Sequence, residues 1–362
     1  MLVLAAVTRA SSRHGRSDVL SRAARRARWE VARRLRPKPA PAPWPAERLQ
    51  RELRPGRLAR EEQTVTATLY GRLSDEDIAA TEQAIREHPG AWEHYFAGAE
   101  RATDRGLLLA LGVWVEAPEL LARTGLTRAE PPEDVHAMTR GAQNAAGGLY
   151  EANMVIDALL SAGGEITGVS SALDFGCSSG RVLKPLAAAF PDVSWHGCDP
   201  NGAAVDWASA HLPGIRFFRS GAVPPLELAD GSLDMAYAIS IWSHFEPRRG
   251  LEWFEEMRRL LRPGGHLVIT THGLSSIAHY AATGQRSTEQ SAEIATALYE
   301  RGWWYAAEFG ASGDWGVVDP NWGNAFLSPE WLLTQLCPRW RVLLYAPGRN
   351  QENQDLYVLQ RV

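Results

Sequence analysis

Short apolar runs recur in the second half of the chain, separated by segments with helical spacing. The runs have the length of strands and lie at 172–175, 193–198, 215–218, 233–239, 266–271, 340–345 and 355–360. Strands that alternate with helices favour a mainly parallel sheet covered by helices. We therefore predict an α/β fold for this part of the chain.

Residues that are common at the ends of helices mark the helix boundaries in this half of the chain. Leu251, Phe254 and Met257 share one helical face, and the pattern stops at Pro263, which is followed by two glycines. The pair at 328–329, serine then proline, predicts another helix start because proline suits the first helical position.

The spacing between 69 and 125 is helical. Ser74 precedes three acidic residues, which is typical of an N-cap followed by a first turn that suits the helix dipole. Further helices are expected at 91–103, 107–115 and 118–121. We interpret about 61–145 as a helical N-terminal region that precedes the sheet.

Charge divides the chain unevenly. Residues 1–60 hold 16 Lys and Arg against 4 acidic residues, and 37–45 contains five prolines, which predicts a flexible basic arm. The arm is either a solvated tail or a tether to anionic lipid or an acidic partner. The remainder holds 22 basic and 38 acidic residues. Such an acidic body repels a polyphosphate, so nucleic acid is not the expected substrate.

The cysteines favour a reducing compartment. Cys177, Cys198 and Cys337 lie far apart, without the pairing of a disulfide scaffold, and no apolar run reaches eighteen residues. We expect a cytoplasmic protein, at most peripheral at the inner face of the membrane. No cluster of His, Cys and Asp has metal-ligand spacing, so metal dependence is not predicted.

A glycine-rich turn follows the run at 172–175. Gly176 and Gly180 lie between a predicted strand and a helix, where ligands bind in open α/β sheets. Ser178 occupies the place of the middle glycine of the dinucleotide fingerprint. The carboxylate of Asp174 disfavours a phosphate but suits a ligand with an ammonium and a sulfonium. Asp199, at the end of the second strand, can accept hydrogen bonds from two ribose hydroxyls.

In sequence order, the segments LDFGCSSGRV, GCDP, DGSLDMAYAISIWSHF and MRRLLRPGGHLVITTHG resemble the successive motifs of class I S-adenosylmethionine (SAM) dependent methyltransferases. More loosely, PPEDVHAMTRG, GDWGVVDPNWGNAF and NQDLYVL are similar to a bacterial subgroup often associated with cell-surface glycan assembly. The resemblance implies a Rossmann-like sheet of seven strands, the last antiparallel, in a SAM-binding domain over about 146–362.

The same resemblance implies which residues bind SAM. Asp174, Gly176 and Gly180 would line the methionine part, and Asp199 would bind the ribose. An acid or amide is common at the position of Ser220 for the adenine amine, so a backbone group or Ala222 is the alternative here. The full expected cofactor set is Asp174, Gly176, Cys177, Gly180, Asp199, Pro200, Asn201, Ser220, Gly221, Ile239 and Ser240.

Two histidines are candidates for a catalytic base. His244 follows the fourth strand and His272 ends the fifth, so both are expected at the carboxyl edge of the sheet. Histidine titrates near neutral pH and can take a proton from a hydroxyl acceptor. Either could instead order a loop or contact the cofactor, and His279 is a third candidate. A carboxylate such as Glu308 is a further alternative.

An insertion at about 274–325 is predicted to form an aromatic-rich cap. Aromatic faces beside carboxylates suit a carbohydrate, although the same rings could simply form the core of the cap. The expected substrate residues are Trp304, Asp314, Trp315 and Trp322.

The leading hypothesis is O-methylation of a small-molecule or glycan-type hydroxyl acceptor with SAM as cofactor. The alternatives are N-methylation of an amine or peptide, and a non-catalytic SAM-binding module in a glycan-assembly complex.

Overall fold

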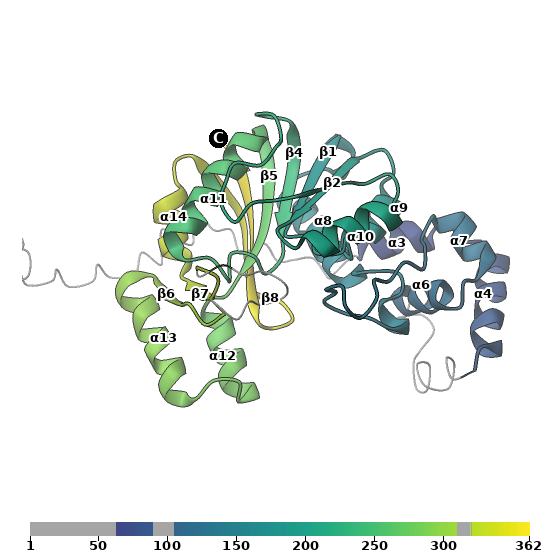
Figure 1. The fold of residues 1–362 in the computed structure, drawn as a ribbon, viewed down its shortest axis with the longest axis horizontal. Helices are drawn as coiled ribbons and strands as arrows, with labels where there is room; N and C mark the ends of the chain where they lie inside the picture. The colour runs from purple at the N-terminus through teal and green to yellow at the C-terminus, as the bar shows by residue number, and fades with distance from the viewer. Residues whose placement is uncertain (1–62, 90–104, 310–318, 320) are drawn as a thin grey trace, which may run out of the picture. The chain divides into compact units, whose positions relative to one another are not determined.

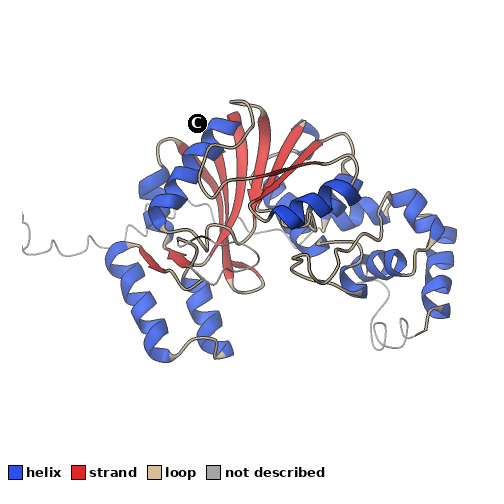
Figure 2. Cartoon of the chain, viewed as in Figure 1, coloured by secondary structure: helices blue, strands red, loops and turns tan. Residues whose placement is uncertain are grey.

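The structure, a computed structural model, describes residues 63–89, 105–309, 319 and 321–362. Their central element is a seven-stranded sheet in the order β3-β2-β1-β4-β5-β9-β8 (Figures 1 and 2). The strands are β1 (Ser171–Phe175), β2 (Ser194–Asp199), β3 (Arg216–Arg219), β4 (Leu233–Ala238), β5 (Leu261–Thr271), β8 (Trp340–Asn350) and β9 (Gln354–Arg361).

Strand direction confirms the predicted fold class. Neighbours from β3 to β5 run parallel, whereas β9 pairs antiparallel with both β5 and β8. The sheet is therefore Rossmann-like, with seven strands of which the last in the chain is antiparallel. Because parallel strands end at one edge, the carboxyl ends of β1, β2, β4 and β5 lie together there.

The strand β5 begins earlier than the predicted start at 266. Leu261 pairs with Leu233, and the register then shifts before Met235 pairs with His266. This irregularity accommodates the Pro-Gly-Gly segment at 263–265, and the preceding helix ends at Leu260.

Helices cover both faces of the sheet, and alternating strand residues meet different cores. Tyr237 packs into the core shared with α8 (Leu149–Ser161) and α9 (Leu183–Ala189). The adjacent Ala236 and Ala238 pack into the core shared with α11 (Pro247–Leu260) and α14 (Pro329–Leu336). The helix α10 (Gly202–His211) contacts β2 and β3.

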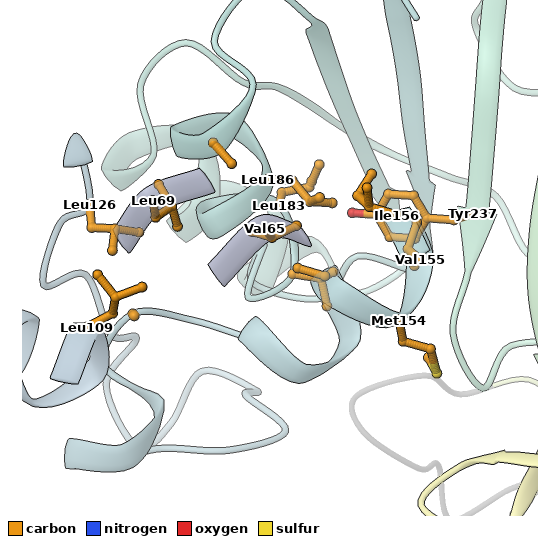
Figure 3. Close-up of a cluster of buried hydrophobic side chains, with 14 of the residues drawn as sticks. Val65, Leu69, Leu109, Leu126, Met154, Val155, Ile156, Leu183, Leu186 and Tyr237 are labelled. Carbon is orange, nitrogen blue, oxygen red and sulfur yellow. The ribbon is translucent and has the colours of Figure 1, made fainter. Parts of the chain in front are cut away.

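The N-terminal helices share the core of α8 and α9 (Figure 3). They are α3 (Thr64–Tyr70), α4 (Asp75–Glu87), α6 (Arg105–Trp114) and α7 (Pro118–Thr124). Ser74 caps α4 through a reciprocal pair of bonds with Asp77, at 2.9 and 3.1 Å. The expected basic arm and the expected helix at 91–103 lie outside the described residues. No helix in the described part is long and apolar enough to span a bilayer.

The described residues of the insertion form a cap of two helices and a two-stranded antiparallel sheet, α12 (Leu274–Thr283), α13 (Thr288–Arg301), β6 (Trp303–Ala306) and β7 (Asn324–Leu327). Backbone bonds attach β7 to the loops that follow the central strands. The Leu327 N–H donates to the His272 carbonyl at 2.9 Å, and the Ala325 N–H donates to the Ser243 carbonyl at 2.7 Å. These bonds fix the cap beside the carboxyl edge of the sheet.

Candidate functional site

A cavity of about 700 Å³ lies at the carboxyl edge of the sheet. Its walls come from the ends of β1, β2, β4 and β5, from the cap, and from the hairpin between β8 and β9. Pockets of roughly 300–1,000 Å³ are usual for small ligands. The cavity has room for a cofactor and a small second molecule.

Asp174 is buried near the end of β1 and lines this cavity. The Tyr237 hydroxyl, from the neighbouring strand β4, donates to Asp174 Oδ2 at 2.9 Å. Burial raises the pKa of Asp174 to about 7, against the opposing effect of the Tyr237 bond and with a contribution from Asp199. The cavity wall thus holds a carboxyl group that a cationic ligand would ionise.

Two glycines of the loop after β1 lie against side chains that leave no room for a Cβ atom. Gly176 has φ +87°, and a Cβ there would lie 2.1 Å from Ile241 Cδ1. Gly180 has φ +78°, and its Cβ would lie 2.7 Å from Leu212 Cδ1. Gly176 lines the cavity, whereas Gly180 faces away from it and allows the loop to pack on the protein.

Asp199 ends β2 and is also buried in the cavity wall. Its Oδ2 accepts the Ser178 N–H and its Oδ1 accepts the Asn201 N–H, both at 2.8 Å. Burial raises the pKa of Asp199, and these bonds oppose the rise. A carboxylate oxygen can accept more than one bond, so ribose hydroxyls still have acceptor sites. Asn201 does not line the cavity; it caps α10 by accepting the Ala204 N–H at 3.2 Å.

The rest of the expected cofactor set lines the same cavity: Cys177, Pro200, Ser220, Gly221, Ile239 and Ser240. The family resemblance placed these residues in the cofactor set, and each lies just after the carboxyl end of a strand.

His272 is buried in the cavity wall, where its Nε2 lies 3.0 Å from the Tyr280 hydroxyl. Burial lowers the pKa of His272 to about 3, with smaller contributions from His244 and Arg286. The imidazole is therefore neutral at physiological pH, and its Nε2 can accept a hydrogen bond from the Tyr280 hydroxyl.

His244 contacts the cap through an aromatic stacking interaction. Its ring stacks on Trp322 at a centroid distance of 4.7 Å, and its Nδ1 donates to the Gly323 carbonyl at 2.9 Å. Burial lowers the pKa of His244 to about 4. Both histidines line the cavity, whereas the third candidate, His279, does not.

Cap residues supply the polar end of the cavity. Arg286 donates two bonds to Glu308, each at 3.2 Å, and Asn324 donates to the same carboxylate. Arg286, Glu308, Asn324 and Trp322 all line the cavity.

Trp304 lies outside the cavity lining, in contrast to its expected role as a substrate residue. Neighbouring residues of β6 point to opposite faces, and Trp304 packs into the cap core against Phe326. Its Nε1 donates to Glu293 at 3.0 Å. The expected substrate residues Asp314 and Trp315 lie outside the described residues.

Several lining residues were not expected from the sequence. Gln354, in β9, accepts from Thr270 at 2.7 Å and donates to Ser240 at 2.5 Å, so it ties together the ends of β4 and β5. Tyr280, Arg286 and His136 are further examples. His136 and Gln354 fall within two of the loosely similar segments, which was the only available signal. No group of three His, Cys, Asp or Glu residues in the described part is arranged to hold a metal ion.

Residues 172–265 match the family profile described as a methyltransferase domain. A 37.1 kDa protein in transposon TN4556 of Streptomyces fradiae is 35% identical over 143 residues, which cover 38% of this chain and 39% of that protein. The malonyl-[acyl-carrier protein] O-methyltransferase of Hahella chejuensis is 27% identical over 142 residues, or 36% of this chain and 50% of the enzyme. The chain thus spans half or less of the length of these relatives.

Similar solved structures include a SAM-dependent methyltransferase from Methanosarcina mazei, at 20% identity and a TM-score of 0.37, covering 53% of this chain and 92% of that one. A SAM-bound amino pentose methyltransferase from Micromonospora echinaspora is 16% identical, with a TM-score of 0.39 and coverage of 59% and 91%.

Proposed function

Because the chain belongs to the class I SAM-dependent methyltransferase family, we propose that it transfers the methyl group of SAM to a hydroxyl of a small-molecule or glycan-type acceptor. The observation that carries the proposal is one cavity that has two buried carboxyl groups at its sheet end and a polar, aromatic cap at its other end.

The residues at the sheet end fit the cofactor. Asp174 would pair with its ammonium group, which suits a carboxyl whose pKa burial has raised to about 7. Asp199 would accept bonds from the ribose hydroxyls. Gly176 would let the loop keep its conformation beside the ligand, since a side chain there would meet Ile241.

The adenine would lie beside the loop after β3. Ser220, Gly221 and Ala222 line the cavity there, and backbone groups are available in place of an acidic side chain. Arg249 donates to the Ala222 carbonyl at 2.7 Å and holds this loop.

The charges of the described lining favour an acceptor without phosphate groups. Its two arginines are each paired with a carboxylate, Arg181 with Glu151 at 2.7 and 2.9 Å, and Arg286 with Glu308. The acids Asp174, Asp199 and Asp319 also line the cavity, so its charge is negative once they ionise. Such a site attracts neutral or cationic molecules.

Proton removal from a hydroxyl would use Tyr280 and His272. The acceptor proton would pass to the Tyr280 oxygen while Tyr280 gives its own proton to His272 Nε2, across the 3.0 Å contact. When bound, the cofactor would supply the methyl group for in-line displacement. His272 would hold the proton at Nε2 only transiently, because burial lowers its pKa to about 3. His244, with Trp322, would shape the acceptor side of the cavity.

N-methylation of an amine is the second candidate, and a specific observation favours it. The low pKa values of His244 and His272 make both histidines weak bases. A neutral amine needs no base before it attacks. The paired cluster of Arg286, Glu308 and Asn324 could accept an amino group as well as hydroxyls.

A turnover experiment separates these proposals. The full chain is incubated with SAM and a panel of glycans, hydroxylated small molecules, amines and peptides, and S-adenosylhomocysteine release is measured. O-methylation predicts release with a hydroxyl compound that lacks an amino group. Release only with amines would favour the second candidate, and stoichiometric SAM binding without any release would favour a non-catalytic module.

A further inference from the structure

A segment without strands lies at 129–147, and we call it the covering segment. His136 and Met138 from this segment line the cavity together with the cofactor loop. Lys184, a buried residue of α9, fixes both of its ends: Nζ donates to the Ala129 carbonyl at 3.1 Å and to the Ala145 carbonyl at 2.5 Å. The segment is thus attached to the helix that follows the cofactor loop.

Internal bonds hold the shape of the covering segment. The Arg140 guanidinium donates to the carbonyls of Pro131 at 3.3 Å, Pro132 at 2.9 Å and Val135 at 2.5 Å. The Glu130 carboxylate accepts the Gly141 N–H at 2.8 Å. These contacts fix the conformation of residues 130–141, which include His136.

His136 meets the cofactor loop at one side chain. Its Nδ1 lies 2.7 Å from Ser178 Oγ. Ser178 has φ +48°, a left-handed conformation that favours glycine and strains a residue with a side chain. The Ser178 N–H donates to Asp199 Oδ2 at 2.8 Å. A chain of contacts therefore runs from the covering segment to the acid proposed to bind ribose.

We infer that His136 is a positioning residue for SAM: through Ser178 it fixes the N–H that orients Asp199, and it holds the covering segment against the cofactor end of the cavity. This inference rests on the proposed function, because it assumes that SAM occupies the cavity. It also gives a reason for a serine at a left-handed position. Glycine would relieve the strain there, but only a side chain can bind His136.

Substitutions of His136 test which ring nitrogen matters. In His136→Ala the 2.7 Å contact of Nδ1 with Ser178 Oγ is lost, whereas the longer contact of Ser178 Oγ with the backbone carbonyl of residue 136, at 3.5 Å, remains. Affinity for SAM should fall by about tenfold, the usual effect of one hydrogen bond. The terminal atoms of Asn branch from Cγ, as Nδ1 does, whereas those of Gln correspond to Nε2. His136→Asn should therefore restore most of the affinity, and His136→Gln should not.

Ser178→Gly separates positioning from general stability. Removing the side chain relieves the strain, so the melting temperature of the unliganded protein should stay equal or rise, while affinity for SAM falls about as much as in His136→Ala. The double variant should bind no more weakly than Ser178→Gly alone, because Ser178→Gly already removes both contacts of Ser178 with residue 136. A loss of affinity caused only by unfolding would lower the melting temperature instead.

The measurement is a calorimetric titration of the full-length chain and its variants with SAM, with His211→Ala as matched control. His211 is an exposed histidine at the end of α10 that bonds the Trp207 carbonyl and lies outside the cavity. If the parent binds SAM and the His136 and Ser178 variants bind equally well, or if Gln restores affinity and Asn does not, the inference is wrong and the proposed function stands. A parent chain that does not bind SAM overturns the proposed function and this inference with it.

Discussion

Asp174 and Asp199 lie at the ends of adjacent strands, but their surroundings prepare them for different partners. Asp199 already accepts two backbone N–H groups, which keep a buried carboxylate ready for hydroxyl donors. Asp174 receives one bond, from Tyr237, and burial raises its pKa to about 7. A charged ammonium would favour the ionised form of Asp174, whereas ribose hydroxyls need only the acceptor sites that Asp199 retains.

Replacing Asp199 with alanine should weaken binding of S-adenosylhomocysteine by about ten- to a hundredfold, because hydrogen bonds to a charged group are lost. Quenching of tryptophan fluorescence by the ligand measures this affinity. Asp206→Ala, which removes an exposed acid paired with Arg219, is the control and should bind normally. Equal affinity in parent and Asp199→Ala would contradict the ribose assignment.

The affinity for SAM should depend on pH through Asp174. Its pKa in the free protein is about 7, and pairing with an ammonium lowers it, so binding weakens as pH falls below 7 by up to about tenfold per pH unit. Above about pH 8 the ligand amine loses its proton and affinity should fall again. Titrations between pH 5.5 and 8.5 would test this. Asp174→Asn should bind weakly with no loss below pH 7, and a parent with a flat profile there would contradict the pairing.

His272 and Tyr280 can be tested once a hydroxyl acceptor is found. His272→Ala should lower kcat by about 10²- to 10⁴-fold with SAM affinity nearly unchanged, and Tyr280→Phe should act in the same direction while keeping the ring. Because the pKa of His272 is about 3, its ionisation should leave the rate unchanged between pH 6 and 8.

His244→Ala distinguishes a structural histidine from a base, because it removes the stacking on Trp322 and should alter acceptor KM more than kcat. If no variant slows turnover at saturating substrate by more than a few-fold, the histidine mechanism is wrong. Alignment alone or a carboxylate such as Glu308 or Asp314 would then account for the rate.

The sequence identifies acids at strand ends more readily than the residues that tune them. Asp174 and Asp199 follow apolar runs beside a glycine turn, which is a local pattern. Tyr237 reaches Asp174 from a strand far along the chain, and Tyr280 reaches His272 from the cap. Such contacts depend on sheet order and cap placement, so the pKa shifts they accompany could not be predicted.

The loop between β1 and α9 has a conformation and a close contact that only glycine tolerates at position 176. Gly176 combines φ +87° with the Ile241 side chain directly in the path of a Cβ. Gly176→Ala should therefore abolish measurable SAM binding and lower the melting temperature. Gly176→Ala with Ile241→Ala removes the clash but not the strain at φ, so it should recover part of the stability. Calorimetry with SAM and thermal unfolding measure the two effects, and wild-type binding by Gly176→Ala would contradict the role of this loop.

Helices and strands with a strong local sequence pattern could be predicted. Features that depend on which side chains are buried in the fold could not. The five parallel strands follow their apolar runs within a few residues, and Ser74 and Ser328 cap helices as expected. The helix α8 was missed because it buries polar as well as apolar residues, among them Asp157, which receives the first N–H groups of α3. The cap residue Trp304 shows that an aromatic cluster does not reveal which rings line a cavity.

At the scale of the whole molecule, the sheet would provide the cofactor end of the cavity in the proposed function, and the cap would provide its acceptor end. The acidic body contrasts with a basic arm at 1–60. We propose that the arm associates with anionic membrane surfaces. Deleting 1–60 should leave turnover in solution unchanged and abolish binding to vesicles containing phosphatidylglycerol at low salt. Vesicle co-sedimentation at two salt concentrations measures this. Unchanged binding after deletion would leave the arm as a solvated tail.

The central claim is that this cavity holds SAM, and calorimetric titration of the full-length chain with SAM at pH 7.5 tests it most directly. The account predicts saturable binding at one site per chain, and loss of that binding in the double variant Asp174→Asn with Asp199→Ala, without loss of the folded state in thermal unfolding. Absence of saturable binding by the parent, or undiminished binding by the folded double variant, would contradict it.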